Sequence, residues 1–272
     1  ILLHRSMVIE LKHTKMKKLL LLITALFILA SVEGQILRYS NYTAPVPPEK
    51  DTLTYAGVIG DDNTFGWYIA DADNLTLNGS EVDYWNDISG DANHLYRAGS
   101  DQRPDWDADN GEVDFTTLDE LRKTSVVHDS PYTIYAVLRI NTPSANSSLI
   151  TLAVDSYYVR ATIPTTTTHI GLTANANYIE PNYDFFTEDE YFILRIVVND
   201  TVSNGSKLQI NENTAYVGTL EAVTSDRIRL GAGNGNESDV SYKEIIIRSH
   251  LDDSNEQQLI VDYLNDKYSV YE

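Results

Sequence analysis

Apolar and polar residues alternate in many short runs from Phe65 to the end of the chain. Clusters of Gly, Asn, Asp, Ser and Thr separate one run from the next. Short alternating runs with turn signals between them predict an all-β sandwich or barrel. The predicted strands are 65–70, 113–116, 131–140, 148–154, 157–163, 168–173, 191–198, 207–210, 214–218, 227–231 and 243–248.

Two of these runs are apolar on both faces, which predicts strands in the middle of a sheet. They are 131–140 and 191–198, where Arg195 is the exception. Asn204-Gly205 separates the second run from Lys207–Ile210, and Asn-Gly is a strong hairpin signal. We therefore expect local, antiparallel connections.

One helix is expected, close to the end of the chain. Asp252, Asp253 and Ser254 can cap a helix from Asn255 to Lys267. Apolar residues recur at helical spacing within it, which predicts that this stripe packs on the sandwich. They are Leu259, Ile260, Tyr263 and Leu264.

The N-terminal part has the layout of a secretory signal peptide. Met16 precedes Lys17-Lys18, an apolar run from Leu19 to Ala30 and a short polar stretch. The run is too short for a membrane span, which needs about 20 apolar residues. We expect a secreted or cell-surface protein with no membrane span. The expected divisions are 1–15 upstream extension, 16–34 signal peptide, 35–54 extended lead-in and 55–272 sandwich domain.

Composition narrows the classes of partner and of chemistry. The chain has 40 acidic and 20 basic residues, a net charge of −20, and no cysteine. Phosphate backbones are bound through Lys and Arg, so nucleic acid is a poor partner for this chain. The lack of cysteine excludes disulfides, thiol catalysis and Cys-based zinc sites.

One ordered set of motifs resembles a known fold family. Residues 84–95 read Y-W-N-D-I-S-G-D-A-N-H-L, followed by Arg103-Pro104 and then Val113-Asp114-Phe115. This order, with the 130–137 and 243–247 segments after it, is similar to the concanavalin A-like (laminin G-like) jelly-roll domains of secreted proteins. The resemblance implies a two-sheet antiparallel sandwich with a short C-terminal helix, and carbohydrate as the ligand class. The 114–119 segment departs from the family's usual F-D-G-x-x-D.

The chain shows no clear catalytic acid pair. Sandwich-fold glucanases place acids on one strand as E-x-D-x-x-E, whereas Glu81-Val82-Asp83 is followed by Trp85 and Asn86. A glycosidase needs two such carboxylates flanking one bond. No HExxH spacing or G-x-S-x-G elbow occurs. His94 lies in the fold motif and is interpreted as a loop-bracing residue. We expect no enzyme activity.

An acidic segment is the candidate metal site. Asp105, Asp107 and Asp109 could supply oxygen ligands to calcium, which extracellular modules bind weakly. The segment is not an EF-hand, because its twelfth position is Thr116. A solvated acidic turn is the alternative. Asp61-Asp62-Asn63 and Asp71-Ala72-Asp73 allow the same two interpretations.

Aromatic residues in or near turns are the candidate sugar platforms, since aromatic faces pack on the C–H side of a pyranose. These are Trp106, Tyr157, Tyr158 and Tyr183, each with ordinary packing as its alternative. Trp67 and Trp85 lie in predicted strands and are expected in the core. Sequons predict surface positions that a glycosylating host would modify. They are Asn41, Asn74, Asn78, Asn146, Asn199, Asn204 and Asn236.

Three functional hypotheses follow. The first is a lectin-like carbohydrate-binding module or adhesin, with a carbohydrate or glycoprotein as partner. The second is a structural or assembly protein of the extracellular matrix or envelope, for which we expect self-association. The third is a glycoside hydrolase or polysaccharide lyase with an acid pair drawn from separate strands.

Overall fold

The computed structural model describes residues 54–97, 99, 102–116, 118–143, 147–154, 157–163, 170–174, 177–179, 186–220, 225–231 and 239–272. The chain divides into two units, Ile1–Thr52 and Leu53–Glu272, and all described residues belong to the second. The predicted signal peptide and most of the lead-in therefore lie outside the described residues, as do Tyr183, Asn41, Asn146 and Asn236. The proposed domain boundary stays a prediction.

The described part consists mostly of antiparallel strands and the loops that join them, as the sequence predicted. It begins with helix α2 (Tyr55–Ile59) and ends with helix α3 (Ser254–Tyr268), and a 3-10 turn η1 (Ala72–Asn74) follows the first strand. The strands are β1 (Thr64–Ile69), β2 (Leu75–Asn78), β3 (Glu81–Trp85), β4 (Leu95–Arg97), β5 (Asp105–Asp107), β6 (Glu112–Phe115), β7 (Glu120–His128), β8 (Tyr132–Thr142), β9 (Ser147–Val154), β10 (Tyr157–Ile163), β11 (Gly171–Ala174), β12 (Asn177–Ile179), β13 (Phe192–Val198), β14 (Ser206–Ile210), β15 (Tyr216–Gly218), β16 (Ser225–Gly231) and β17 (Asp239–Arg248).

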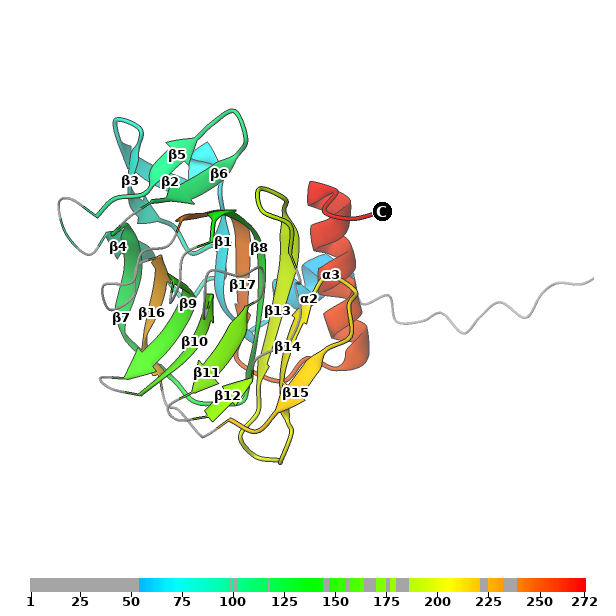
Figure 1. Ribbon diagram of the computed structural model, residues 1–272. Coiled ribbons are helices and arrows are strands. Elements are labelled where there is room, and N and C mark those ends of the chain that lie inside the picture. The colour runs from blue at the N-terminus through cyan, green and yellow to red at the C-terminus, as the bar shows by residue number, and fades with distance from the viewer. Residues whose placement is uncertain are drawn as a thin grey trace, which may run out of the picture. The chain divides into compact units, whose positions relative to one another are not determined.

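Backbone pairing joins the strands into a folded sheet with two layers (Figure 1). One layer has the order β1-β17-β8-β13-β14-β15, with β6 paired to the first half of β17. The other has the order β4-β7-β16-β9-β10-β11-β12. A small extension made of β2, β3 and β5 joins the two at one end. The all-β sandwich is confirmed.

The main core fills the space between the layers. Leu138 and Ile196 contribute to it from one layer, and Leu152 and Ile228 from the other. Trp85 is completely buried in this core, as predicted. Burial of such side chains contributes about 25 cal/mol per Å² of apolar surface, which lets a chain of this size fold without disulfides.

Two helices cover the outer face of the β17-β8-β13 layer. Tyr135, Val137, Ile193 and Ile246 point away from the main core and pack against apolar residues of α2 and α3 in a second cluster. In Figure 1, α3 lies beside β13, on the side away from β9 and β10. This cover explains why β8 and β13 are apolar on both faces, as the sequence indicated. Trp67, expected in the main core, is partly buried against this helix cluster instead.

The predicted helix is confirmed, with one more residue at each end. Asp253 caps it through a capping box: the Asp253 carboxylate accepts the Glu256 backbone N–H, and the Glu256 carboxylate accepts the Asp253 backbone N–H. The buried Glu244 ties the helix to β17. It accepts the Trp67 indole N–H at 2.7 Å, the Lys267 ammonium at 2.7 Å and the Tyr268 hydroxyl at 2.7 Å.

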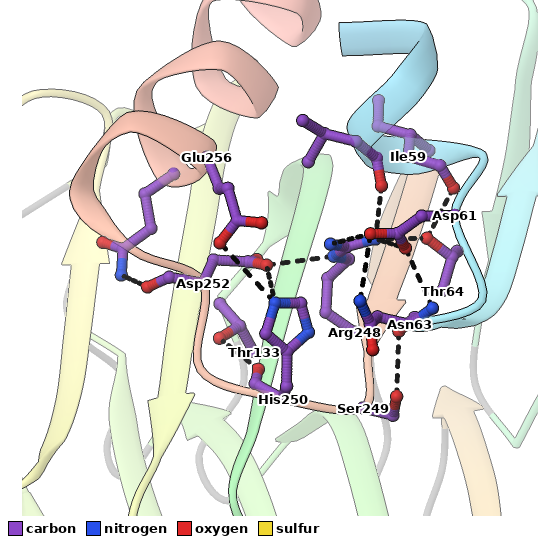
Figure 2. Close-up of polar contacts among 12 residues, drawn as sticks. Ile59, Asp61, Asn63, Thr64, Thr133, Arg248, Ser249, His250, Asp252 and Glu256 are labelled. Atoms are coloured by element: carbon purple, nitrogen blue, oxygen red, sulfur yellow. Dashed lines mark hydrogen bonds and ion pairs between the residues drawn. The ribbon is translucent and has the colours of Figure 1, made fainter. Parts of the chain in front are cut away.

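A buried arginine joins α2, the α2–β1 turn and the start of α3 (Figure 2). The Arg248 side chain is 0% exposed; its Nε donates to Asp252 Oδ1 at 3.0 Å and its Nη2 to Asp61 Oδ2 at 3.1 Å. Its Nη1 also donates to Thr64 Oγ1 at 2.7 Å and to the Val58 carbonyl. The Asp61 carboxylate is thus engaged with an arginine, and metal binding at the 61–63 turn stays a prediction.

The Asn-Gly signal lies in the connection from β13 to β14, which runs from Asn199 to Gly205, and Asn204 there adopts φ 57°. The pairing of β13 with β14 is antiparallel, as expected. Six strands were not predicted as such: β2, β3, β4, β5, β7 and β12. Most of them are short and polar, so they carry little alternation.

Candidate functional site

The predicted acidic segment forms the β5–β6 hairpin. Asp105 pairs directly with Asp114, Trp106 with Val113, and Asp107 with Glu112. Directly opposite residues of an antiparallel pair share a face. The hairpin therefore places carboxylates on one face, while Trp106 and Val113 pack on the main core.

The structure groups the carboxylates differently from the predicted calcium set. Oxygens of Asp107, Glu112 and Asp114 lie within 4.8 Å of one another. Asp105 accepts the Ser80 hydroxyl at 3.1 Å, and Asp109 contributes its backbone N–H to Asp107 Oδ1 at 2.9 Å. Asp107 is thus the shared member of both sets. Glu112 ends the acidic segment but was not in the predicted ligand set, and Asp114 lies beyond the segment on the return strand.

The charges in this cluster are already partly balanced. Glu112 is fully buried, accepts Arg139 Nη2 at 2.6 Å and accepts the Tyr191 hydroxyl. Burial raises the pKa of Asp114, although a hydrogen bond from Ser241 opposes this. Hydrogen bonds from the Asn110 side chain and backbone lower the pKa of Asp107. Calcium binding at this hairpin stays a prediction.

The candidate aromatic platforms have different surroundings. The ring of Trp106 is partly buried and packs on the core, so part of its surface is already occupied. Tyr157 and Tyr158 lie in β10, where the Tyr158 backbone pairs with Ala153; their side chains are outside the described residues, as is Tyr183.

The described sequon residues also differ from one another. Asn78 and Asn204 are exposed, and Asn74 is partly exposed at the end of η1. Asn199 is only 8% exposed, and its Oδ1 accepts the Thr201 hydroxyl at 2.6 Å and the Thr201 N–H at 3.0 Å. The expectation of a surface position is wrong for Asn199, because its side chain closes the turn after β13.

A second candidate site lies on the outer face of the β4-β7-β16-β9-β10-β11-β12 layer. Pairing in register creates a continuous row across this layer and its extension. The row runs Tyr84, Tyr96, Arg122, Arg229, Thr151, Arg160, Thr173 and Tyr178, one residue from each of β3, β4, β7, β16, β9, β10, β11 and β12. We call these residues the arginine–tyrosine row. Sequence neighbours of its members, such as Leu121, Ile228 and Leu152, point into the core, so the described side chains of the row face away from it. Arg160 belongs to the row by its backbone register alone.

Tyrosines mark the two ends of the row. Tyr84 is 49% exposed at one end and Tyr178 is 44% exposed at the other. Tyr96 is partly buried, and its hydroxyl lies 2.8 Å from Thr124 Oγ1. Thr124 belongs to the next row, where it pairs with Arg227 and Arg227 pairs with Ala153.

The arginines surround one buried carboxylate. Glu120 Oε1 lies 3.3 Å from Arg229 Nε and 3.7 Å from Arg122 Nη1, and the Glu120 side chain is 6% exposed. Burial raises the pKa of Glu120, while Arg229, Arg122 and Arg227 act to lower it. The Arg229 side chain is itself only 15% exposed. Glu120 and its arginines therefore form an ion-pair cluster whose carboxylate is shielded from solvent.

Thr151 lies at the middle of the row, between Arg229 and Arg160 in the backbone register. It points away from the core, yet it is only 4% exposed. Among the described residues, its hydroxyl oxygen is buried without a hydrogen-bond partner. Buried polar atoms normally have a partner, so an unsatisfied hydroxyl here marks a place where a ligand atom or water can bind.

Neither described helix covers this face, since α2 and α3 pack on the other layer. No described helix is both long and apolar enough to cross a membrane. The sequence could not reveal the row, because it depends on the pairing of β7 with β16, which are separated by about a hundred residues. The sequence did single out Tyr158, whose backbone pairs with Ala153, the residue with which Arg227 also pairs.

Comparison with solved structures shows the same fold in sugar-related proteins. A Trypanosoma rangeli sialidase in complex with sialic acid matches with a TM-score of 0.53 and 10% identity, over 77% of this chain and 34% of that one. The ligand binding domain of botulinum neurotoxin serotype D, in complex with N-acetylneuraminic acid, matches with a TM-score of 0.54 and 14% identity, over 77% of this chain and 53% of that one. Domain 4 of AbnA, an extracellular GH43 arabinanase of Geobacillus stearothermophilus, was solved in complex with arabinotriose. It matches with a TM-score of 0.51 and 12% identity, over 73% of this chain and 97% of that one.

These likenesses show a shared β-sandwich fold. The match spans about a third of the sialidase chain and about half of the neurotoxin chain. No protein-family model matches the sequence, and a search of curated proteins gives no match.

Proposed function

We propose that this chain is a non-catalytic, lectin-like carbohydrate-binding module that is secreted or displayed at the cell surface. The observation that carries the proposal is the arginine–tyrosine row on a sheet face that neither described helix covers. The concanavalin A-like type of sandwich, which the sequence motifs resemble, belongs to the same proposal.

The chemistry of the row suits a sugar. A pyranose or furanose has an apolar C–H face and hydroxyl groups around its ring. An aromatic side chain can stack on the C–H face. Exposed Tyr84 and Tyr178 offer such rings, while Arg122, Arg229 and Thr151 offer donors and an acceptor between them. A few placed polar groups with aromatic neighbours are typical of small-ligand sites.

The comparisons support the same ligand class. Two of the matching structures contain sialic acid or N-acetylneuraminic acid, and a third contains arabinotriose. One matching structure is a domain of an arabinanase, and another is of a sialidase, so catalysis is the competing hypothesis. The close acids of the hairpin do not favour it, because Glu112 is held by Arg139 and Tyr191.

The test is a glycan-array screen of the full chain, with Tyr84→Ala as the test variant and Tyr55→Ala as the matched control. Tyr55 is 51% exposed but lies on α2, on the helix-covered side. We expect selective glycan binding that Tyr84→Ala weakens and Tyr55→Ala preserves. A blank array from folded protein would contradict the proposal. Release of reducing ends or unsaturated products from the ligand would show that the chain is an enzyme and not a non-catalytic module.

A further inference from the structure

The row concentrates positive charge in a chain that has an excess of acidic residues. The whole chain carries 20 Lys and Arg against 40 Asp and Glu. Even so, Arg122 and Arg229 are direct cross-strand partners, and Arg229 also pairs with Thr151, whose other partner is Arg160. Arg227 occupies the adjacent row. Solubility does not require such a concentration, since a net charge of −20 already provides it.

This arrangement of arginines is unfavourable for the stability of the sheet. Like charges directly opposite on neighbouring strands destabilise a sheet. Within the described part of the face, Glu120 and Asp226 are the acids in ion pairs with these arginines, and Asp226 engages Arg227 at 2.8 Å. Local choices that oppose the fold are expected at functional sites.

Building on the carbohydrate-binding function above, we propose that the arginine–tyrosine row selects an anionic carbohydrate, whose carboxylate or sulfate group binds at Arg229 and Arg122. Arginine suits this task because its planar fork donates two parallel hydrogen bonds to a carboxylate or sulfate. The buried hydroxyl of Thr151 is directly beside Arg229 in register and offers the next polar contact to the sugar.

The flanking tyrosines argue for an acidic sugar over other anions. Tyr84 lies two strands from Arg122 and Tyr178 lies four strands from Arg229, with about 4.8 Å between neighbouring strands. An oligosaccharide of several residues would therefore be needed to place an anionic group at the arginines and an apolar ring face on a tyrosine. A long polyphosphate chain would extend beyond the arginines onto a chain whose net charge is −20, and the repulsion there would weaken it. The anionic group can be a carboxylate, as in uronic or sialic acids, or a sulfate ester.

The experiment compares oligosaccharides of one backbone in neutral, carboxylated and sulfated forms, by titration calorimetry with the full chain. The test variant is Arg229→Met, and the matched control is Arg195→Met. Arg195 is also a half-buried arginine of a central strand, but its strand neighbour Ile193 packs against the helix cluster of the other layer and its own partner is Gln209. Each variant removes one positive charge.

We expect at least one acidic form to bind about tenfold or more tightly than the neutral form, because the neutral form cannot make the charge-assisted hydrogen bond to arginine. Arg229→Met should remove that preference, while Arg195→Met keeps it. Arg229→Lys should retain part of it, which guards against a folding defect in the Met variant. Comparison of the carboxylated and sulfated arms identifies the anion.

Two results would overturn the inference in different ways. Equal binding of neutral and acidic forms, or equal loss in both Met variants, would show that the protein binds sugar without anionic selection at the row. Absence of binding to every form by the folded chain would overturn the carbohydrate-binding function together with the inference.

Discussion

Arg122 and Arg229 stand directly opposite each other across β7 and β16, and Glu120 is the carboxylate that both approach, at 3.7 and 3.3 Å. The relationship places two like charges in one cross-strand pair, with the buried Glu120 as an acid that interacts with both. It follows that the row lowers the stability of the sheet while preparing a surface for an external anion.

The first prediction concerns stability. Replacing Arg122 by Met removes the like-charge pair but leaves Arg229 with Glu120. We expect the free energy of unfolding to rise by about 0.2–1 kcal/mol, the size of such a cross-strand effect. Urea denaturation measures it, and Arg195→Met, which has no arginine opposite, serves as the control. A loss of more than about 1 kcal/mol in Arg122→Met would show that Arg122 has a structural role instead.

The second prediction concerns pH. Because burial raises the pKa of Glu120, its carboxyl takes up a proton at a higher pH than the ordinary value of 4.5. Protonation removes the Glu120 charge, which interacts favourably with Arg122, Arg227 and Arg229. Binding of a sulfated oligosaccharide should therefore strengthen as the pH falls from neutral towards the raised pKa, since the sulfate keeps its charge.

Glu120→Gln isolates this effect. The variant should bind the sulfated probe more tightly than the native chain at neutral pH, and its affinity should lose the pH dependence that belongs to Glu120. The same carboxyl opposes folding when ionised, so its favourable contribution to stability is complete below about pH 4.5 and is lost as the pH rises through its raised pKa. An unchanged binding profile in Glu120→Gln would contradict the assignment.

The third prediction concerns the buried Arg248. Arg248→Met leaves the buried Asp252 with only the Tyr135 hydroxyl, at 2.8 Å, and the partly exposed His250, at 3.2 Å. Breaking a buried ion pair in this way costs about 3–5 kcal/mol of unfolding free energy. Asp61→Asn should cost less, because the Asp61 side chain is 30% exposed. Chemical denaturation of the two variants checks the order.

The fourth prediction concerns calcium at the β5–β6 hairpin. With a dissociation constant of about a millimolar, as extracellular modules have, a tenfold excess of calcium would stabilise the chain by about 1.4 kcal/mol. The melting temperature should rise with calcium in the native chain and stay constant in Asp107→Asn, since Asp107 is common to the predicted and the observed carboxylate groups. Equal shifts in both proteins would assign the effect to another site.

The sequence predicted the parts of the fold that local pattern controls. Alternation located β8 and β13, and the cap at Asp253 located α3. The W-N-D motif gave both a buried Trp85 and a bracing role for His94, whose Nδ1 accepts the Asp87 N–H at 2.9 Å.

What the sequence could not reveal depends on long-range pairing. Arg122 and Arg229 carry no local signal that they meet, and Glu112 enters the hairpin cluster only because β6 folds back on β5. The short strand β4 contributes Tyr96 to the row through three residues, too few for a periodicity. Site residues of this kind become visible only when the strand register is known.

The most direct test of the central claim is hydrogen–deuterium exchange of the full chain with and without a bound oligosaccharide. We predict slower exchange in β7, β16 and β9, where the row crosses the layer, and unchanged exchange in α3. Protection confined to the β5–β6 hairpin or to α3, with no change in β7 and β16, would contradict it and move the binding site away from the arginine–tyrosine row.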